Sequence, residues 1–372
     1  MKCILWGVSG IGNGHSHRQV PLIAHYAKTC RIVIFAYGES YRNFKRLYRG
    51  RKNVAIIRID VPFWAGKRGG LDFLKTARLN AGKDFLTVNC QAFARAERLI
   101  GKPDLVVTDY EPMSAQYAYA FGAPLVTFDQ QSKYLCGDFP SRLGGQAYRD
   151  EVVRLSMFFP AAAARIACSF FKVKRQAGSP EVVIVPPPLK ESIISLRRSP
   201  KKGTPSILVY VSSARPFVQT TSGVMRVLSS VTNAHFHVFM KNPGKRRLPE
   251  NVSVYEHGDR RFHKILAECN GIVSTAGHML LSEAMHLGIP IYAIPLAVYE
   301  QQMNAHVIGS NGFGISRPRI EKKSLAAFVR NLPKCASAIE RDRSVLLRRP
   351  GQGEIIRRLD RFLKKVKTGA RN

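Results

Sequence analysis

The apolar residues of the chain gather into short runs that are separated by longer amphipathic stretches. In the first half these runs are rich in β-branched residues and predict buried strands: Cys3–Val8, Ile32–Phe35, Val54–Ile59, Leu105–Thr108 and Leu125–Phe128. The stretches between them, such as Leu71–Leu99, mix polar and apolar residues as helices do. Alternating strands and helices indicate a parallel sheet that is covered by helices on both faces.

The same alternation begins again after Pro205. Five further runs predict strands: Ile207–Val211, Phe236–Met240, Val252–Tyr255, Ile272–Ser274 and Ile291–Ile294. Between the halves lie the proline-rich Val185–Leu189 and the basic, polar Arg197–Gly203, a composition that favours a linker. The sequence therefore predicts an α/β protein with these parts: a Rossmann-like domain over 1–188, a linker over 189–204, a second Rossmann-like domain over 205–347, and a basic amphipathic helix within 348–372.

That last helix is expected over Glu354–Lys367. Its apolar residues, among them Ile355, Leu359 and Phe362, share one helical face, and basic residues occupy the opposite face. A helix docked on the protein is the preferred interpretation, and a helix lying on a membrane surface is the alternative.

Composition narrows the class of protein. A chain of 372 residues suits two domains, and its apolar runs fall short of the roughly 20 residues of a membrane span. The first residues are expected to form a strand and not a signal peptide. The seven cysteines are scattered, with no C-x-x-C pair and no His cluster at metal spacing. We therefore expect a cytoplasmic protein without a bound metal.

Charge is the unusual feature of the composition. Lys and Arg number 58 against 25 Asp and Glu, which leaves a net charge of +33. Such a surplus indicates a polyanionic partner, either nucleic acid or an anionic membrane surface, and a lineage-wide bias is the alternative. The segment Arg42–Lys52, which contains Arg46 and Arg49, interleaves cations with aromatic residues, a combination suited to phosphate contact and base stacking.

The most informative motif runs from Ile272 to Pro290. A strand ends at Ser274, a turn of small residues follows, and a helix is expected to begin near Gly277, where free N–H groups and the helix dipole favour a pyrophosphate. Glu283 lies six residues further, about 9 Å along a helix, an offset that suits hydrogen bonds to ribose hydroxyls.

Past the next strand, Glu300, Gln301 and Gln302 offer donors and acceptors for sugar hydroxyls, or alternatively only cap a helix. Ser212 and Ser213 follow the first strand of this half and could stabilise the leaving diphosphate.

The loop after the first strand reads Gly10-Ile11-Gly12-Asn13-Gly14-His15. Its glycine spacing departs from G-x-G-x-x-G, and no acid closes the second strand directly, so a nicotinamide cofactor is disfavoured.

These motifs resemble a known family. The pattern Gly277, Glu283, Pro290, Pro295, Glu300-Gln301 and Asn304-Ala305 is similar to the donor site of the UDP-glycosyltransferase superfamily and of the lipid-II-forming N-acetylglucosaminyltransferase. Closer still, Pro103–Pro112 and Thr127–Gln131 resemble a little-characterised prokaryotic branch of these enzymes. The resemblance implies the GT-B architecture, in which two doubly wound domains face each other across a cleft. The sequence departs from this pattern at His278, which stands where many relatives carry a second glycine. The imidazole is expected either to contact the phosphate or to alter the pose of the donor.

The resemblance also assigns roles in the first half. It places His15 as the general base that takes a proton from the acceptor hydroxyl, and places Gly12, Asn13, Gly14 and Arg18 at the acceptor. An imidazole that becomes positive gains from a carboxylate behind it. Asp109, which follows the strand Leu105–Thr108, is the leading candidate, and Glu111 and Asp129 stand at comparable strand ends as alternates that could also contact the acceptor.

The expected activity is that of a metal-independent inverting glycosyltransferase. It would need no cofactor and would move a sugar from a UDP-sugar to a hydroxyl of a polyanionic acceptor, preferentially a modified base in DNA or RNA. A lipid-linked or cell-surface glycan acceptor is the first alternative, and a small-molecule acceptor is the second. A nucleic-acid-binding protein that has lost catalysis and a nucleotide-sugar 2-epimerase on the same fold are further alternatives. The sequence leaves the transferred sugar and the oligomeric state open.

Overall fold

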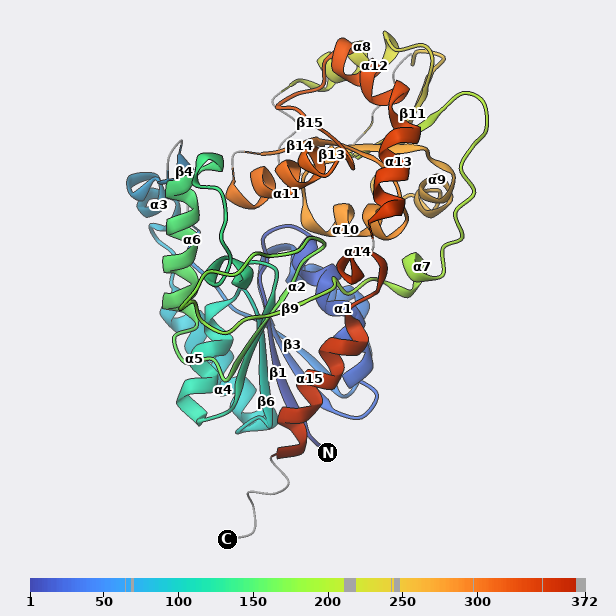
Figure 1. Cartoon of the computed structure of the whole chain (residues 1–372). Coiled ribbons are helices and arrows are strands. Elements are labelled where there is room, and N and C mark those ends of the chain that lie inside the picture. The colour runs from blue at the N-terminus through green and yellow to red at the C-terminus, as the bar shows by residue number, and fades with distance from the viewer. Residues whose placement is uncertain are drawn as a thin grey trace. The chain divides into compact units, whose positions relative to one another are not determined.

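The computed structural model of the chain describes residues 1–63, 65–67, 70–210, 219–241, 243, 248–296, 298–342 and 344–365. It divides into two compact units (Figure 1). The first unit consists of Met1–Lys190 together with the residues from Pro350 onward, and the second consists of Glu191–Arg349. The first unit is therefore built from two separate segments of the sequence.

A seven-stranded parallel sheet forms the centre of the first unit, in the order β3-β2-β1-β6-β7-β8-β9. Its strands are β1 (Cys3–Val8), β2 (Arg31–Ala36), β3 (Val54–Arg58), β6 (Leu105–Asp109), β7 (Leu125–Asp129), β8 (Ala164–Cys168) and β9 (Val183–Val185). The strands β1, β2, β6 and β7 are almost continuously apolar and buried, as expected of a sheet with helices on both faces.

The helices of the first unit connect these strands. They are α1 (Gly14–Tyr26), α2 (Gly38–Leu47), α3 (Phe73–Asn80), α4 (Phe85–Ile100), α5 (Pro112–Phe121), α6 (Gly145–Phe158) and α15 (Gln352–Lys365), with short 3₁₀ turns η1 (Ser132–Leu135) and η2 (Ser141–Leu143) and a small hairpin of β4 (Gly66–Lys67) and β5 (Gly70–Leu71). The stretch that the sequence predicts as helical over 71–99 is thus two helices. Asp72 and Asp84 cap them by accepting from the N–H groups of Lys75 and Thr87.

Helix α15 returns from the end of the chain to the first unit. Ile355, Leu359 and Leu363 belong to the same buried core as the strands of the first sheet. The Tyr26 hydroxyl of α1 donates to Asp360 Oδ1 at 2.9 Å. Figure 1 shows the red α15 lying beside the blue elements of this unit. The apolar face of α15 is therefore docked on the protein, which is the interpretation that its sequence pattern favours.

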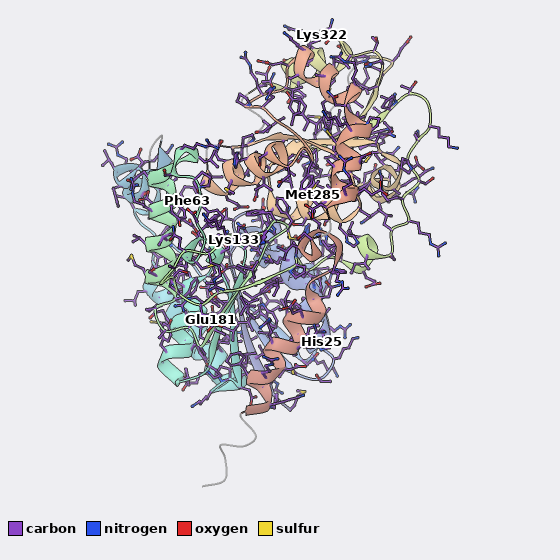
Figure 2. All side chains as sticks on the ribbon, viewed as in Figure 1. His25, Phe63, Lys133, Glu181, Met285 and Lys322 are labelled. Atoms are coloured by element: carbon purple, nitrogen blue, oxygen red, sulfur yellow. The ribbon has the colours of Figure 1, made fainter. Side chains whose placement is uncertain are left out.

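The second unit has a six-stranded parallel sheet in the order β12-β11-β10-β13-β14-β15. Its strands are β10 (Ser206–Tyr210), β11 (His235–Met240), β12 (Val252–Glu256), β13 (Gly271–Thr275), β14 (Ile291–Ile294) and β15 (Gly314–Ser316). Its helices are α7 (Glu191–Ile194), α8 (Thr221–Ser229), α9 (Phe262–Glu268), α10 (His278–His286), α11 (Tyr299–Ser310), α12 (Lys322–Arg330), α13 (Leu332–Arg341) and α14 (Val345–Arg348). Figure 2 shows the side chains of both units and labels Lys133, buried in the first, and Met285, buried in the second.

In each sheet the first strand in sequence lies in the interior. The next strands are added on one side of it, and the later strands are added on the other side. The strand order reverses between β1 and β6 in the first unit, and between β10 and β13 in the second. In open α/β sheets, ligands bind outside the carboxyl ends of the strands at such reversal points. The two doubly wound sheets that the sequence predicts are confirmed, and so are the ten strand positions. The pattern missed the strands β8, β9 and β15, which lie towards one edge of each sheet.

Candidate functional site

The reversal point of the first sheet brings the glycine-rich loop beside Asp109. Val8 ends β1 and pairs in register with Asp109, the last residue of β6. The N–H of Ser9 donates to the carbonyl oxygen of Asp109 at 2.9 Å, which holds the start of the loop against β6. Two elements that are far apart in the sequence therefore meet at this edge.

Glycine is required within this loop for steric and conformational reasons. A Cβ atom on Gly10 would lie 2.1 Å from the carbonyl oxygen of Tyr37, so the loop can pack against the residues before α2 only with glycine there. Gly12 has a φ of 71°, which L residues with side chains rarely adopt. The loop then leads directly into α1, whose first turn contains His15.

His15 and Asp109 form a hydrogen-bonded pair. Nδ1 of His15 lies 2.9 Å from Oδ1 of Asp109, and the histidine side chain is 12% exposed whereas the aspartate is fully buried. With its proton on Nδ1, the imidazole donates to Asp109 and carries its lone pair on Nε2. Of the three carboxylates that the sequence leaves open as partners of His15, Asp109 is the one that contacts it.

Asp109 has two further partners from α1. Arg18 donates through Nε to Oδ2 at 3.0 Å and through Nη2 to Oδ1 at 2.7 Å, and Gln19 donates to Oδ2 at 2.7 Å. Burial alone would raise the pKa of Asp109, but Arg18 and His15 more than offset this effect and lower it to about 2. Asp109 is therefore ionised throughout the range in which an imidazole titrates.

The other carboxylates suggested by the sequence cap local turns. Glu111 is fully buried and accepts hydrogen bonds from the N–H groups of Met113 and Ser114 at the start of α5. Burial raises the pKa of Glu111 to about 7, although these hydrogen bonds oppose the shift. Asp129 is also fully buried and accepts from the N–H of Ser132 at 2.6 Å and from its hydroxyl at 2.7 Å. Burial raises the pKa of Asp129 to about 6.

The residues expected at the acceptor differ in their exposure. Asn13 is exposed and accepts from Asn43 Nδ2 of α2 at 2.8 Å, and Gly12 and Gly14 are partly exposed. Arg46 and Arg49 are exposed as well. Arg18, in contrast, is only 2% exposed, and its guanidinium is directed at Asp109. Arg18 therefore contacts the His15–Asp109 pair.

One sequence interpretation of the basic segment Arg42–Lys52 is wrong. Its aromatic residues Phe44 and Tyr48 are buried in the core, so they are not available to stack on bases. The cations of the segment remain exposed, and the bond between Asn43 and Asn13 places α2 next to the glycine-rich loop. The segment therefore offers charge without an aromatic platform.

Tyr110 belongs to this site, although no role of its own is predicted for it from the sequence. It directly follows Asp109, is 9% exposed, and stacks on His15 with 6.1 Å between the ring centroids. Its hydroxyl donates to Glu151 of α6 at 2.9 Å and accepts from Arg154 at 2.7 Å. The one available signal was its place immediately after a strand-end acid.

In the second unit the reversal point lies at the start of α10. Strand β13 ends at Thr275, and Gly277 is the residue before the helix. Gly277 has φ −71° and ψ 132°, which any residue can adopt, and a Cβ atom there would meet no described atom within 4 Å. The open space above this helix start lets a ligand approach the first N–H groups of α10 closely.

The side chains expected to bind the donor are arranged around this turn. Glu283 is 9% exposed and lies in α10. His278 is 3% exposed and is packed within α10, where its Nδ1 lies 3.4 Å from the Ser282 hydroxyl. Asn304 of α11 donates to the carbonyl oxygen of Ala276 at 2.9 Å and so ties α11 to the turn.

Two of the three polar residues in the first turn of α11 contact the loop before the helix. Gln301 accepts from the N–H of Leu296 at 3.0 Å, and Gln302 donates to the carbonyl oxygen of Leu296 at 3.0 Å. These two amides therefore fix the loop before the helix, while the partly exposed Glu300 lies in the same first turn. Ser212 and Ser213 lie outside the residues that the structure describes.

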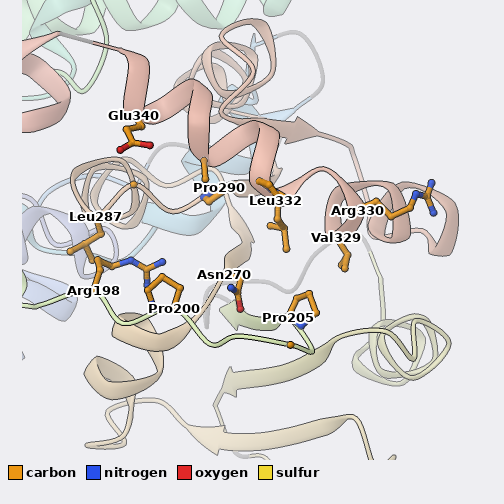
Figure 3. A pocket seen from close by; sticks show the side chains of 14 residues that line it. Arg198, Pro200, Pro205, Asn270, Leu287, Pro290, Val329, Arg330, Leu332 and Glu340 are labelled. Carbon is orange, nitrogen blue, oxygen red and sulfur yellow. The ribbon is translucent and has the colours of Figure 1, made fainter.

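A separate hollow of about 560 Å³ lies at the opposite edge of the second sheet (Figure 3). Pro205, Asn270 and Pro290, which line it, stand immediately before β10, β13 and β14, so the hollow adjoins the amino ends of the strands. Arg198, which also lines it, donates to the carbonyl oxygens of Leu266, Ala267 and Cys269. This hollow is thus distinct from the turn at Gly277.

Two features are absent from the part of the chain that the structure describes. It contains no group of three or more His, Cys, Asp or Glu side chains arranged to hold a metal ion. None of its helices has the length and apolar character that crossing a bilayer requires.

The comparisons with known proteins agree with this fold. The chain is similar to the calicheamicin glycosyltransferase CalG4, with 17% identity, a TM-score of 0.68, and 98% of this chain and 99% of that chain covered. It is similar to MurG of Acinetobacter baumannii, with 15% identity, a TM-score of 0.63, and 97% and 100% covered. It is also similar to SsfS6 of Streptomyces sp. SF2575 in complex with thymidine diphosphate, with 17% identity, a TM-score of 0.62, and 97% and 100% covered.

These likenesses show the GT-B fold of two Rossmann-like units. No curated protein sequence matches the chain. A family model matches residues 2–333, which include the His15–Asp109 pair and the turn at Gly277. The chain therefore belongs to glycosyl transferase family 1 and is a glycosyltransferase.

Proposed function

We propose that the protein transfers a sugar from a UDP-sugar to an acceptor hydroxyl by direct displacement, with inversion at the anomeric carbon and without a divalent metal. His15 is the general base in this proposal, and Asp109 orients it and stabilises its positive form. The observation that carries the proposal is the 2.9 Å contact between His15 Nδ1 and Asp109 Oδ1. A base held in this way presents Nε2 to the acceptor proton, and direct attack by the acceptor leaves no covalent intermediate.

The donor part of the proposal rests on the second unit. The start of α10 offers backbone N–H groups and the positive end of a helix dipole to a diphosphate, which replaces the charge that a metal would supply. Glu283, in the same helix, is the proposed partner of the ribose hydroxyls. The structure of SsfS6 in complex with thymidine diphosphate is that of a similar protein with a nucleoside diphosphate, and it supports a nucleotide donor for this chain.

For the acceptor, the exposed cations of α2 and the turn after it favour a polyanion. Lys45, Arg46, Arg49 and Arg51 are all exposed, and Asn43 of the same helix is bonded to Asn13 of the glycine-rich loop. Phosphates that contact these cations would bring a neighbouring hydroxyl group close to the loop that precedes His15. A nucleic acid with a hydroxylated base is the acceptor of this kind that we place first.

One observation favours a second candidate, a lipid-linked acceptor at an anionic membrane surface. Helix α3 has no buried residue, and its Phe73, Leu74 and Leu79 are 72%, 62% and 44% exposed. Lys75 and Arg78, in the same helix, are exposed too. Cations beside exposed apolar side chains are what binding to anionic lipid requires. Leu155, Phe159, Phe170 and Phe171 are buried and do not add to this exposed apolar surface, whereas Met157 of α6 is 69% exposed.

The experiment that tests the mechanism compares the wild type with His15→Ala and Asp109→Asn, using hydrolysis of a UDP-sugar panel and transfer to extracts of nucleic acid or lipid. We expect His15→Ala to lower kcat by about 10²- to 10⁴-fold while UDP affinity stays within about twofold. Nuclear magnetic resonance of the product should show the inverted anomer. A retained configuration, or a fully active His15→Ala variant, would reject His15 as the base.

A further inference from the structure

The guanidinium of Arg18 contacts both members of the His15–Asp109 pair. Arg18 follows His15 by three residues in α1, so both side chains leave the helix on one face. Its Nη2 donates to Asp109 Oδ1 at 2.7 Å and lies 2.9 Å from His15 Nδ1. Its Nε donates to the other carboxylate oxygen at 3.0 Å. The three side chains therefore form one cluster in which a fixed cation lies beside the proposed base.

The surroundings keep this cluster in place. Gln19 accepts from the indole N–H of Trp6 at 2.9 Å and donates both to Asp109 and to the carbonyl oxygen of Phe128. The titratable groups that face the cluster come from the ends of three neighbouring strands and the turn after β7: Asp109, Tyr110, Asp129, Lys133 and Cys168. Burial raises the pKa of Cys168 to about 11, so this thiol is neutral near pH 7. Arg18 and Asp109 are thus the charges in direct contact with His15.

The two charges act on the imidazole in opposite directions. A carboxylate alone favours the imidazolium form, which has no lone pair with which to accept a proton. Arg18 Nη2 and the protonated His15 Nδ1 both donate to Asp109 Oδ1, which brings the cation within 2.9 Å of the ring. A cation this close favours the neutral form of the imidazole. The forked contact also fixes both carboxylate oxygens, so Asp109 keeps Oδ1 directed at His15.

We propose that Arg18 is a positioning residue of the transfer reaction, which holds Asp109 against His15 and keeps the imidazole neutral until the acceptor proton arrives. This inference rests on the proposed function, because it concerns the same base. It also gives Arg18 a role other than binding the acceptor. A residue that bound acceptor phosphate would change the KM of the acceptor, whereas a residue that sets the protonation of His15 changes the pH at which kcat falls.

The test uses Arg18→Met and Arg18→Gln, which remove the charge, and Arg18→Lys, which keeps it. We expect the acidic limb of the kcat–pH profile to move to higher pH by about one unit in both neutral variants, since the repulsion that opposes protonation of the ring is gone. Arg18→Lys should keep the limb near its wild-type position but lower kcat, because one ammonium group cannot hold both carboxylate oxygens. Gln19→Met is the matched control: it removes a neutral donor from the same carboxylate and should move the limb less.

A second readout does not depend on activity. The His15 imidazole is titrated by nitrogen-15 nuclear magnetic resonance in the full chain, with His15→Ala used to assign its signal. Its midpoint should rise in Arg18→Gln and Arg18→Met relative to wild type. Folded neutral variants with an unchanged midpoint, or variants that change only the KM of the acceptor, would overturn the proposal. If His15→Ala stays active, the proposed function fails, while the titration still decides the effect of Arg18 on the ring.

Discussion

The imidazole of His15 and the phenol ring of Tyr110 lie nearly parallel, with 18° between their planes. Tyr110 holds this position with a φ of 56°, in the left-handed region, and among the described residues it is the one non-glycine residue there. Strained backbone of this kind persists where the surroundings fix it, and it gathers at functional sites. Here the ring is held between His15 on one side and Glu151, Arg154 and Phe158 of α6 on the other.

Replacing Tyr110 tests whether this backbone conformation is strained. Both Tyr110→Gly and Tyr110→Ala remove the ring, but only glycine adopts a positive φ without a steric penalty. We therefore expect Tyr110→Gly to be more stable than Tyr110→Ala by about 1 kcal/mol in urea unfolding. Lys45 in α2 provides the control, because there alanine should be the more stable replacement by about the same amount. Equal stability of the two Tyr110 variants would show that the backbone relaxes.

Removal of the carboxylate of Glu283 should weaken donor binding. A lost charge-assisted hydrogen bond to ribose corresponds to about 1–3 kcal/mol, so Glu283→Ala and Glu283→Gln should bind UDP with a clearly raised Kd in calorimetry. Glu250→Ala, which changes an exposed carboxylate just before β12, is the control and should bind as the wild type does. The same titration is repeated with a chelator. Loss of UDP binding there would contradict the proposed metal independence.

The buried carboxyl group of Glu111 predicts a pH-dependent stability. Its pKa is raised from 4.5 to about 7, so the folded state holds the proton more tightly than the unfolded state does. The stability that this group contributes is therefore complete below about pH 4.5 and is lost as the pH rises through about 7. Glu111→Gln keeps an oxygen acceptor for the start of α5 but does not titrate. The Tm of the variant relative to wild type should increase between pH 5 and pH 8, and a constant difference would contradict the assignment.

Charge reversal at Arg46, Arg49 and Arg51 tests the acceptor class. If the acceptor is duplex DNA, each phosphate contact adds about −0.9 to the slope of log K against log salt, so losing these contacts should flatten the slope by about 2 to 3. UDP affinity should not change. The matched control is charge reversal of the exposed Arg95, Arg98 and Lys102. It changes the net charge by the same amount as the first set, but at a different part of the chain.

Both sets of charge-reversal variants, together with the α3 variants Phe73→Asp and Leu74→Asp, are then measured for binding to vesicles of anionic lipid. Tight vesicle binding that is abolished by Phe73→Asp and Leu74→Asp in α3, together with negligible nucleic-acid binding, would select the lipid-linked acceptor. Equal slopes for the two sets of charge reversals would show that α2 has no special part in binding.

Most of the parallel strands were predictable because each of these is a continuous apolar run between polar stretches. Cys3–Val8 and Ile291–Ile294 were located to the residue. Strands β9 and β15 have only three residues each, too short for a pattern to stand out. The break between α3 and α4 was missed because the amphipathic character continues through it, while the caps at Asp72 and Asp84 depend on single residues.

The site was predictable in part for a related reason. Carboxyl ends of parallel strands share one edge, so the position of Asp109 after its strand was enough to place it near the first loop. Which way a side chain points depends on packing that the sequence does not display. The burial of Arg18, the inward orientation of Phe44 and the conformation of Tyr110 all follow from contacts with distant residues.

The docking of α15 has a consequence for how the protein is made. Its Ile355, Leu359 and Leu363 complete a core whose other buried members lie between Ile4 and Val185. During synthesis the first sheet leaves the ribosome long before this helix exists, and at a translation rate of about 5–20 residues per second the delay is about ten seconds or more. The nascent first unit therefore exposes the apolar face that α15 later covers, while the second unit, which is continuous in sequence, is able to fold in the interval.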